Sequence, residues 1–204
     1  MLRTIGIQKR LLAAFGLLAF MLAALGVYNL NTMSQIRERA SLLETNVIPS
    51  LVSVADLNNT VTRLRVQTLR LMLTTDIDNE TATLQLVATL RQDAQEIEHR
   101  YKALISLDEE QRIYDEFSPQ LAQYLQLQSQ AIEFLKQDET GLALDLLQQI
   151  NPLTDAIAAN LIRLTDLNEE AAATARVESI AGYEQARLFV IILIVLAVVI
   201  AVVI

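Results

Sequence analysis

The chain has apolar stretches at both ends and a polar, helix-patterned middle. Residues 11–27 form one apolar run, and residues 188–204 form a second that is richer in Ile and Val. Each run approaches the roughly 20 residues that an α-helix needs to cross a hydrocarbon core of about 30 Å. The pattern therefore predicts two transmembrane helices that enclose one water-facing domain.

The middle of the chain is patterned as four helices. Its apolar residues recur at three- and four-residue steps, the period of an amphipathic helix. Gly and Pro are scarce, with five and three in the whole chain. Polar, turn-forming breaks at residues 74–79, 106–109 and 138–141 separate the helices. The helices predicted between these breaks span roughly 31–75, 79–105, 107–137 and 141–187.

The loops between these helices are short, and helices joined by short loops pack as antiparallel neighbours. The fold class predicted is all-α: an antiparallel up-down four-helix bundle. The first and last helices are each about 45 residues long, or near 67 Å. We expect both to continue directly into the two transmembrane helices, without a linker.

Three local features refine the expected helix ends. Ser106 and Glu109 have the spacing of a capping box at the start of the third helix. Pro49 and Pro119 each lack an amide hydrogen, so each is expected to kink or restart its helix.

The distribution of charge predicts the orientation in the membrane. Arg3, Lys9 and Arg10 precede the first apolar run, while all 24 acidic residues lie between the two runs. The positive-inside rule then places the N-terminus in the cytoplasm and the middle outside it. The expected layout is a cytoplasmic N-terminus (1–10), a transmembrane helix (11–30), an extracytoplasmic bundle (31–187) and a second transmembrane helix (188–204). An acidic domain also argues against a nucleic-acid partner.

Two further expectations concern the ends of the chain. Residues 11–26 resemble a cleaved signal peptide in length, and Ala24 and Gly26 supply small residues near a cut site. The apolar run continues through Val27 and Tyr28, which favours a membrane anchor instead. The second span has no basic residue after it, so we expect the protein to continue into a cytoplasmic signalling part.

Composition argues against most catalytic chemistry. The chain has no cysteine and one histidine, His99, so no transition-metal site has credible ligands. There is no glycine-rich phosphate loop and no nucleophile paired with a base. We expect no enzyme activity, no cofactor and no metal.

One segment of the first helix stands out chemically. Residues 57–75 contain three arginines and no acidic residue. At 100° per residue, one apolar stripe is formed by Leu57, Val61, Leu64 and Leu71. The flank of that stripe is formed by Thr60, Arg63, Gln67, Arg70 and Thr74, whereas Arg65 points well away.

Arg63 and Arg70 place two guanidinium groups beside a packing face, where a neighbouring helix partly desolvates them. That is unfavourable without compensation. A bound carboxylate compensates through charge-assisted hydrogen bonds, each about 1.5–3 kcal/mol. The alternative is that both arginines pair with acids elsewhere in the bundle and keep their ends in water.

The organisation resembles the sensory half of bacterial methyl-accepting chemotaxis proteins of the four-helix-bundle type, typified by the aspartate receptor. Residues 46–51 (Asn-Val-Ile-Pro-Ser-Leu), Arg70 before Leu-Met-Leu, and residues 143–147 ahead of Pro152 fit that family. The resemblance implies a homodimer in the bacterial inner membrane with a periplasmic sensor domain. It also implies a ligand site near the membrane-distal end of the dimer interface, and HAMP and signalling domains after the second span.

The resemblance carries over to ligand residues only in part. Arg70 matches one of the family's ligand arginines, but the other two fall on Val61 and Val66, so aspartate specificity is not transferable. Arg63 is expected to substitute, and the polar contacts near the family's last-helix proline correspond to Asn151 and Thr154. The ligand-binding residues expected are Arg63, Gln67, Arg70, Thr74, Asn151 and Thr154.

The function expected is thus a transmembrane chemoreceptor that binds a small anionic ligand, an organic acid or an amino acid, between two copies of the chain. Ligand binding would displace the last helix and reach a kinase through the cytoplasmic part. Two alternatives stay open. The same module precedes histidine kinases and nucleotide cyclases, and a membrane-anchored bundle could dock another protein with no small ligand at all.

Overall fold

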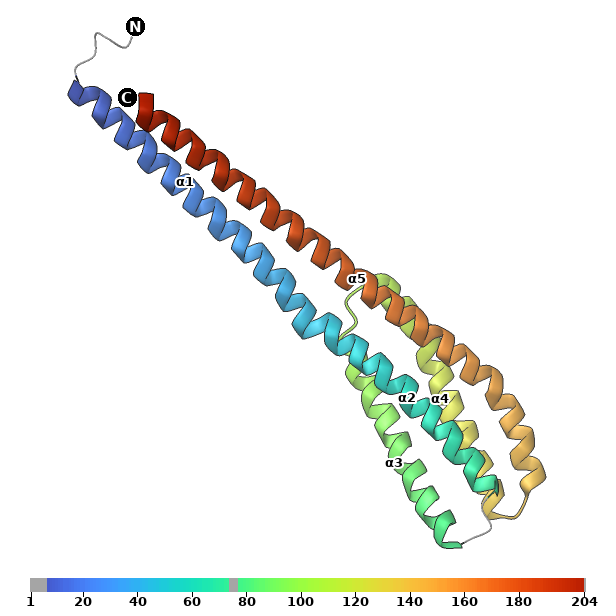
Figure 1. Ribbon diagram of the computed structural model, residues 1–204. Coiled ribbons are helices and arrows are strands. Elements are labelled where there is room, and N and C mark those ends of the chain that lie inside the picture. Colours follow the sequence, from blue (N-terminus) through green and yellow to red (C-terminus); the bar gives the residue numbers. More distant parts are fainter. Residues whose placement is uncertain (1–6, 74–76, 204) are drawn as a thin grey trace. The chain divides into compact units, whose positions relative to one another are not determined.

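The computed structural model describes residues 7–73 and 77–203, and the regular structure in these ranges is entirely helical (Figure 1). The elements in chain order are α1 (Ile7–Leu42), the π-helix η2 (Leu43–Val47), α2 (Ile48–Leu73), α3 (Ile77–Lys102), α4 (Asp108–Lys136) and α5 (Thr140–Val203).

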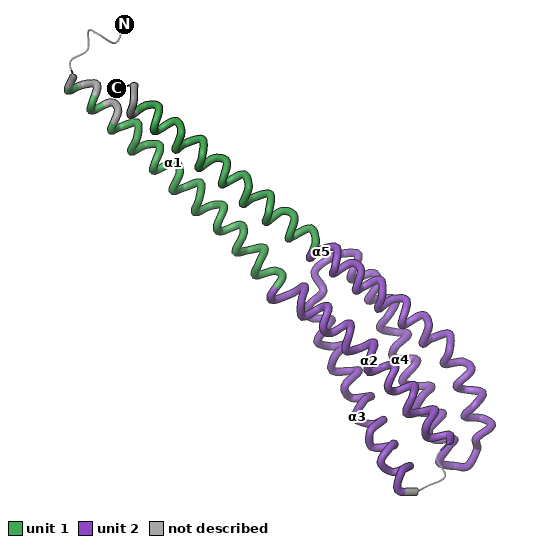
Figure 2. Tube along the Cα trace, in the orientation of Figure 1, with its two compact units in different colours: residues 1–43, 173–204 green, residues 44–172 purple. Residues whose placement is uncertain are grey.

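These helices form two compact units, which are coloured separately in Figure 2. Residues 44–172 form the larger unit, in which α2, α3, α4 and the first part of α5 alternate in direction (Figure 1). This unit is the predicted antiparallel four-helix bundle, so the fold class is confirmed. The last helix is also continuous, as expected: α5 is a single helix of 64 residues that runs through both units.

The bundle is held together by an apolar core to which all four helices contribute. The predicted stripe on α2 lies within it: Leu57, Val61, Leu64 and Leu71 are all buried. The other helices meet this stripe with side chains that are less than 2% exposed, namely Leu90, Tyr101, Phe117, Tyr124, Ile157, Leu161 and Leu164. Burial of apolar side chains at helical spacing is the main stabilising term in such a bundle.

The capping box expected from Ser106 and Glu109 is wrong by one position. The residue before α4 is Leu107, and its side chain makes no capping hydrogen bond. Glu110 reaches back instead, and its Oε2 accepts a hydrogen bond from the Ser106 backbone amide at 3.0 Å. Glu109 pairs with Arg112 at 2.7 Å on the surface. Glu110 is buried and Glu109 pairs with the exposed Arg112, so Glu110 is the carboxylate that is left to bond the Ser106 amide.

The connection between α4 and α5 lies where the sequence predicts a break. α4 ends at Lys136, and Asp138 adopts a left-handed backbone conformation with φ of 58°. Asp is one of the few residues other than Gly that adopts this conformation at modest cost. α5 then begins at Thr140.

The prolines have different effects on their helices. The π-helix Leu43–Val47 lies immediately before Pro49. Since proline has no amide hydrogen, the carbonyl four residues earlier loses its α-helical partner, and a single π turn accommodates that loss without a loop. α4 continues through Pro119 and α5 through Pro152, so neither helix restarts there.

The smaller unit consists of residues 1–43 and 173–204. Within it the rings of Tyr28 and Phe189 lie 4.5 Å apart between centroids, and Arg39 pairs with Glu178 at 3.2 Å. Many of its large apolar side chains are exposed, with Phe20 at 72% among them, although Met21 is buried. Two helices of the described chain are long and apolar enough to cross a membrane. Surfaces of this kind are unfavourable in water and suit a lipid environment.

Candidate functional site

α2 presents a second apolar stripe on the side opposite the bundle core. Its large members are Ile48, Val52, Val66, Leu69 and Leu73, which are 45–83% exposed. The exposed Ala55, Asn59 and Thr62 complete a regular alternation of three- and four-residue steps along the helix. That heptad spacing is typical of a helix that packs against another helix. We call these eight residues the outer stripe.

Arg63 and Arg70 flank the outer stripe on one side. Both are exposed and lie seven residues apart, so they lie on the same face of α2. Arg63 makes no hydrogen bond or ion pair with any residue that the structure describes. Between them, Gln67 is half-buried, and its Oε1 is buried without a hydrogen-bond partner among the described residues. Thr74, the fourth residue expected on this flank, lies outside the described residues.

Of the two residues expected on α5, Asn151 contacts the opposite flank of α2 and Thr154 bonds within its own helix. Thr154 is 8% exposed, and its hydroxyl donates to the Ile150 carbonyl at 3.0 Å. Asn151 is exposed, and its Oδ1 accepts a hydrogen bond from Arg65 at 3.1 Å. Within one bundle, Asn151 therefore contacts Arg65 and not Arg63 or Arg70.

Arg65 is the residue that the sequence interpretation missed. On a helical wheel Arg65 lies about 100° from Leu64 on one side, and Arg63 lies about 100° from Leu64 on the other side. Because a helix in a four-helix bundle has a neighbour on each side, both flanks of the stripe are positions between helices. Arg63 and Arg65 are at equal angles from Leu64, and this symmetry was the signal in the sequence that could have identified Arg65 as a position between helices.

Arg65 lies at the edge of a cavity of about 280 Å³ between α2, α4 and α5. This cavity is slightly smaller than the roughly 300–1,000 Å³ that is usual for small-molecule sites. The lining residues are Arg65, Thr68, Leu69, Tyr124, Gln128, Leu144, Leu147, Gln148, Ile150 and Asn151. One cation, one phenol, several amides and four aliphatic side chains thus surround one space.

The buried polar groups beside the cavity are mostly satisfied. Gln128 donates through Nε2 to the Thr68 hydroxyl at 2.8 Å, and Arg91 donates to Gln128 Oε1 at 3.2 Å and to the Leu125 carbonyl at 2.7 Å. Burial lowers the pKa of Arg91 from its usual value, although an arginine stays charged near neutral pH. This chain of hydrogen bonds fixes the amide of Gln128 and the hydroxyl of Thr68.

Tyr124 is the exception in this region. It is 1% exposed, and its hydroxyl has no hydrogen-bond partner among the described residues. Burial raises the pKa of Tyr124 above its usual value, and the charges of Arg65 and Arg91 oppose that rise. The phenol therefore stays protonated and is a hydrogen-bond donor without an acceptor.

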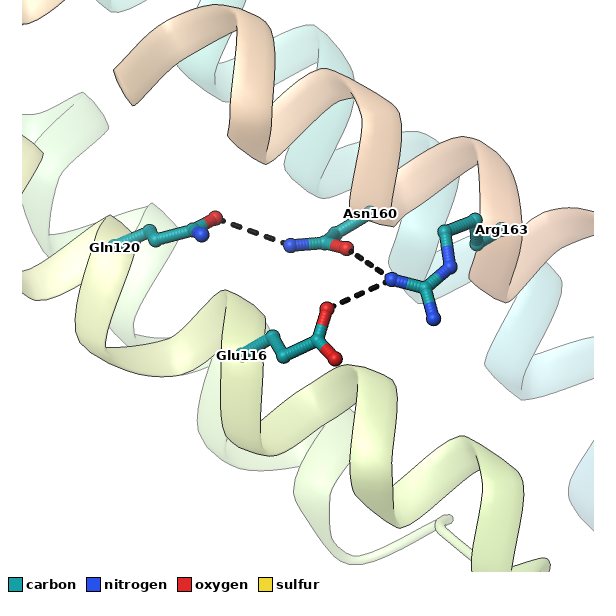
Figure 3. Close-up of polar contacts among 4 residues, drawn as sticks. All are labelled: Glu116, Gln120, Asn160 and Arg163. Atoms are coloured by element: carbon teal, nitrogen blue, oxygen red, sulfur yellow. Dashed lines mark hydrogen bonds and ion pairs between the residues drawn. The ribbon is translucent and has the colours of Figure 1, made fainter. Parts of the chain in front are cut away.

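A second polar cluster links α4 to α5 (Figure 3). Arg163 Nη1 contacts Glu116 Oε2 at 2.7 Å and Asn160 Oδ1 at 2.9 Å, and Asn160 donates to Gln120 Oε1 at 3.1 Å. Every one of these side chains has a partner within the cluster. We interpret the cluster as an attachment of α5 to α4 and not as a binding site.

The chain was then compared with known proteins. Residues 4–183 match a family model described as a four helix bundle sensory module for signal transduction. Among curated proteins, the chain is similar to YvaQ of Bacillus subtilis (strain 168), provisionally named a sensory transducer protein. The two are 22% identical over 186 residues, which cover 91% of this chain and 32% of that protein. The chain thus spans about a third of the length of this relative.

Proposed function

Since the chain belongs to the family of four-helix-bundle sensory modules for signal transduction, we propose that it senses a small anionic ligand at an interface between two copies. The ligand is an organic acid or an amino acid. The family is that of chemotaxis transducers, and the readout proposed is chemotaxis. The proposed location is the bacterial inner membrane, with the bundle in the periplasm and the N-terminus in the cytoplasm.

The observation that carries this proposal is the outer stripe of α2 with Arg63 and Arg70 beside it. A bundle that buries one face of α2 and leaves a heptad-spaced apolar face exposed has a surface suited to a second α2 helix. We therefore assign the homodimer interface to this stripe.

Dimerisation through the outer stripe has an electrostatic consequence. The approach of a second copy removes water from around Arg63, which has no hydrogen bond or ion pair with a described residue, and desolvation of a cation is unfavourable unless an anion or a hydrogen-bond acceptor compensates it. A ligand carboxylate supplies both. Gln67, Thr74, Asn151 and Thr154 complete the proposed set. Thr154 donates its hydroxyl hydrogen to Ile150, so it has only acceptor capacity left.

The proposed output passes through α5, which is helical without interruption from Thr140 to Val203. A ligand that binds one arrangement of the bundle more tightly than another shifts the balance between them by its difference in affinity. A displacement of α5 relative to α2 would then reach cytoplasmic signalling domains and their kinase. Those parts belong to the proposal through the family, because the chain spans only a third of its relative.

The test uses the full chain in lipid nanodiscs. A thermal-shift screen of organic acids and amino acids identifies a ligand, because a ligand bound only by the native state raises the melting temperature. Calorimetry with Arg63→Ala and Arg70→Ala should then give an affinity about tenfold to a hundredfold lower. Arg112→Ala is the matched control, since it removes an exposed arginine of the same bundle that pairs with Glu109 on α4.

Two outcomes would count against the proposal. Unchanged affinity in Arg70→Ala would remove the assignment of the ligand site to α2. If no acid or amino acid in the screen raises the melting temperature, the bundle functions as a docking domain and not as a receptor for small anions.

A further inference from the structure

The cavity between α2, α4 and α5 differs from the proposed interface site in the number of copies that form it. All its lining residues belong to one bundle, so it exists without a second copy. Neither Arg63 nor Arg70 lines it. The two sites share Leu69, which belongs to the outer stripe, and Asn151, but their cations differ, so substitutions of Arg65 and of Arg63 and Arg70 can separate them.

The wall of the cavity contains a donor that the protein leaves unused, the Tyr124 hydroxyl. Almost every buried polar group in a folded protein has a partner, because an unpaired one keeps the cost of its desolvation. The Tyr124 hydroxyl is buried without a partner, whereas the neighbouring Gln128 and Thr68 are bonded to each other. The hydroxyl oxygen is covered in the free protein, so an acceptor that enters the cavity and displaces the covering side chains would satisfy it.

The edge of the cavity contains a cation without a counter-ion. Of the described residues that line the cavity, Arg65 is the one cation, and none is a carboxylate. Arg65 has one hydrogen bond, to the neutral amide oxygen of Asn151. The guanidinium has five N–H donors, so most remain available. Its charge also acts on Tyr124, as the opposing effect on the pKa of that phenol indicates.

We propose that this cavity is a binding site, one in each bundle, for a small monocarboxylate with an apolar body. The carboxylate oxygens accept hydrogen bonds from the Arg65 guanidinium and the Tyr124 hydroxyl. The apolar body packs against the aliphatic side chains that line the space, which are Leu69, Leu144, Leu147 and Ile150.

Other ligand chemistries fit less well. A cation would approach Arg65 with Arg91 nearby, and like charges repel. A fully apolar ligand would leave the Tyr124 hydroxyl unpaired. A neutral polar ligand would satisfy Tyr124 but would leave Arg65 without a counter-charge. Only an anion with an apolar portion uses the cation, the phenol and the aliphatic wall together.

Occupancy of this cavity would have a structural consequence, because it connects helices far apart in sequence. The ligand would bridge α2, through Arg65, to α5, through the side chains near Asn151. The Glu116–Arg163 contact attaches α5 to α4 about three helical turns further along. Binding would therefore fix the start of α5 against α2, on the helix that continues to Val203.

Benzoate is the probe, with phenylacetate and 4-methylpentanoate as further members of the class and benzamide as the uncharged analogue. Calorimetry is done on the full chain in lipid nanodiscs. We expect saturable binding of benzoate, no measurable binding of benzamide, and an affinity about tenfold to a hundredfold lower in Arg65→Ala. Tyr124→Phe should lower the affinity about tenfold without lowering the melting temperature of the free protein, since the hydroxyl has no partner to lose.

Tyr101→Phe is the matched control. Its hydroxyl donates to Glu110 at 2.7 Å, far along the bundle from the cavity. This variant should lower the melting temperature and leave benzoate affinity unchanged. The double variant Arg63→Ala/Arg70→Ala should also leave benzoate affinity unchanged, which separates this site from the proposed interface site.

Three results would overturn the inference. One is that none of the three carboxylates binds at millimolar concentration, which would make the cavity a space for water only. The second is that Arg65→Ala and Tyr124→Phe bind benzoate as tightly as the unmodified chain. The third is that benzoate affinity depends on Arg63 and Arg70 and not on Arg65, which would leave the interface site standing and remove this one.

Discussion

The guanidinium of Arg65 donates a hydrogen bond to the side-chain oxygen of Asn151 at 3.1 Å, across 86 residues of sequence. This contact joins α2 to α5, the helix that leaves the bundle after Ala172. It also lies at the edge of the cavity that has both Arg65 and Tyr124 in its lining. The hydrogen bond between Arg65 and Asn151 thus links two helices, and both residues belong to a candidate site.

Removal of this link should cost little stability in the absence of ligand. Both side chains are exposed, and exposed polar pairs contribute about 0–1 kcal/mol. A double-mutant cycle of Arg65→Ala and Asn151→Ala, followed by thermal unfolding of the detergent-solubilised chain, should give a coupling free energy below about 1 kcal/mol. A coupling well above that would show that the pair is a structural contact and would weaken the case for Arg65 as a ligand group.

Glu110 should be far more important for stability than any surface carboxylate. It is 1% exposed and accepts hydrogen bonds from the Tyr101 hydroxyl at 2.7 Å, the Ser106 amide at 3.0 Å and the Asn168 side chain at 3.2 Å. Glu110→Leu would leave the buried Tyr101 hydroxyl without an acceptor and the Asn168 amide with only its bond to the Leu164 carbonyl, and each buried unsatisfied group costs about 1–3 kcal/mol. We expect a loss of about 2–4 kcal/mol in the free energy of unfolding, measured by chemical denaturation.

Glu116→Leu is the matched control for that prediction. Glu116 is a carboxylate of the same helix, half-exposed and paired with Arg163 (Figure 3). Its substitution should cost less than about 1 kcal/mol, because its partner can return to water. Equal losses in the two variants would contradict the role assigned to Glu110.

The fold could be predicted from the sequence because the information is local and repeated. Leu57, Leu64 and Leu71 recur at heptad spacing, and all three are buried as expected. The break near Asp138 is polar and lies where α4 ends. The cap of a helix that begins with adjacent carboxylates was harder to predict. Glu109 and Glu110 are adjacent, and only packing decides which of them points inward.

The candidate site could be predicted only in part, for a related reason. A helical wheel gives the angle of a side chain around its own helix, but it does not give the position of the neighbouring helices. Arg65 was therefore assigned to the outside, although α5 lies beside that flank and supplies Asn151. The unpaired hydroxyl of Tyr124 depends on the relative placement of three helices, and no pattern in one of them contains that information.

Stability should fall at alkaline pH. Burial and the hydrogen bond to Glu98 raise the pKa of Tyr114 from 10.0 to about 12, and burial raises the pKa of Tyr101 and Tyr124 as well. Between pH 10 and pH 12 the unfolded chain loses phenol protons that the native chain keeps, so unfolding is favoured as pH rises. Below the ordinary tyrosine pKa this stabilisation is fully present.

Thermal melts across this pH range, read together with tyrosinate absorbance, would check the prediction. We expect the melting temperature to fall as pH rises above about 10. In a chain with Tyr28→Phe and Tyr183→Phe, we also expect the tyrosinate of Tyr101, Tyr114 and Tyr124 to appear together with unfolding and not before it. Tyr114→Phe should make the fall less steep. Tyrosinate that forms in the folded protein near pH 10 would contradict the assigned burial of these phenols.

Contact between two copies through the outer stripe can be tested by disulfide cross-linking. The chain has no cysteine, so single substitutions report without interference. Val66 is 53% exposed on the outer stripe, and a stripe packed against its counterpart brings the same residue of both copies close together. Val66→Cys and Val52→Cys should therefore form covalent dimers in native membranes on mild oxidation. A disulfide requires Cα atoms within about 7 Å.

Gln123→Cys, on an exposed position of α4, is the control and should stay monomeric. Cross-linking at Gln123 and not at Val66 would move the interface off α2, and with it the site assigned to Arg63 and Arg70.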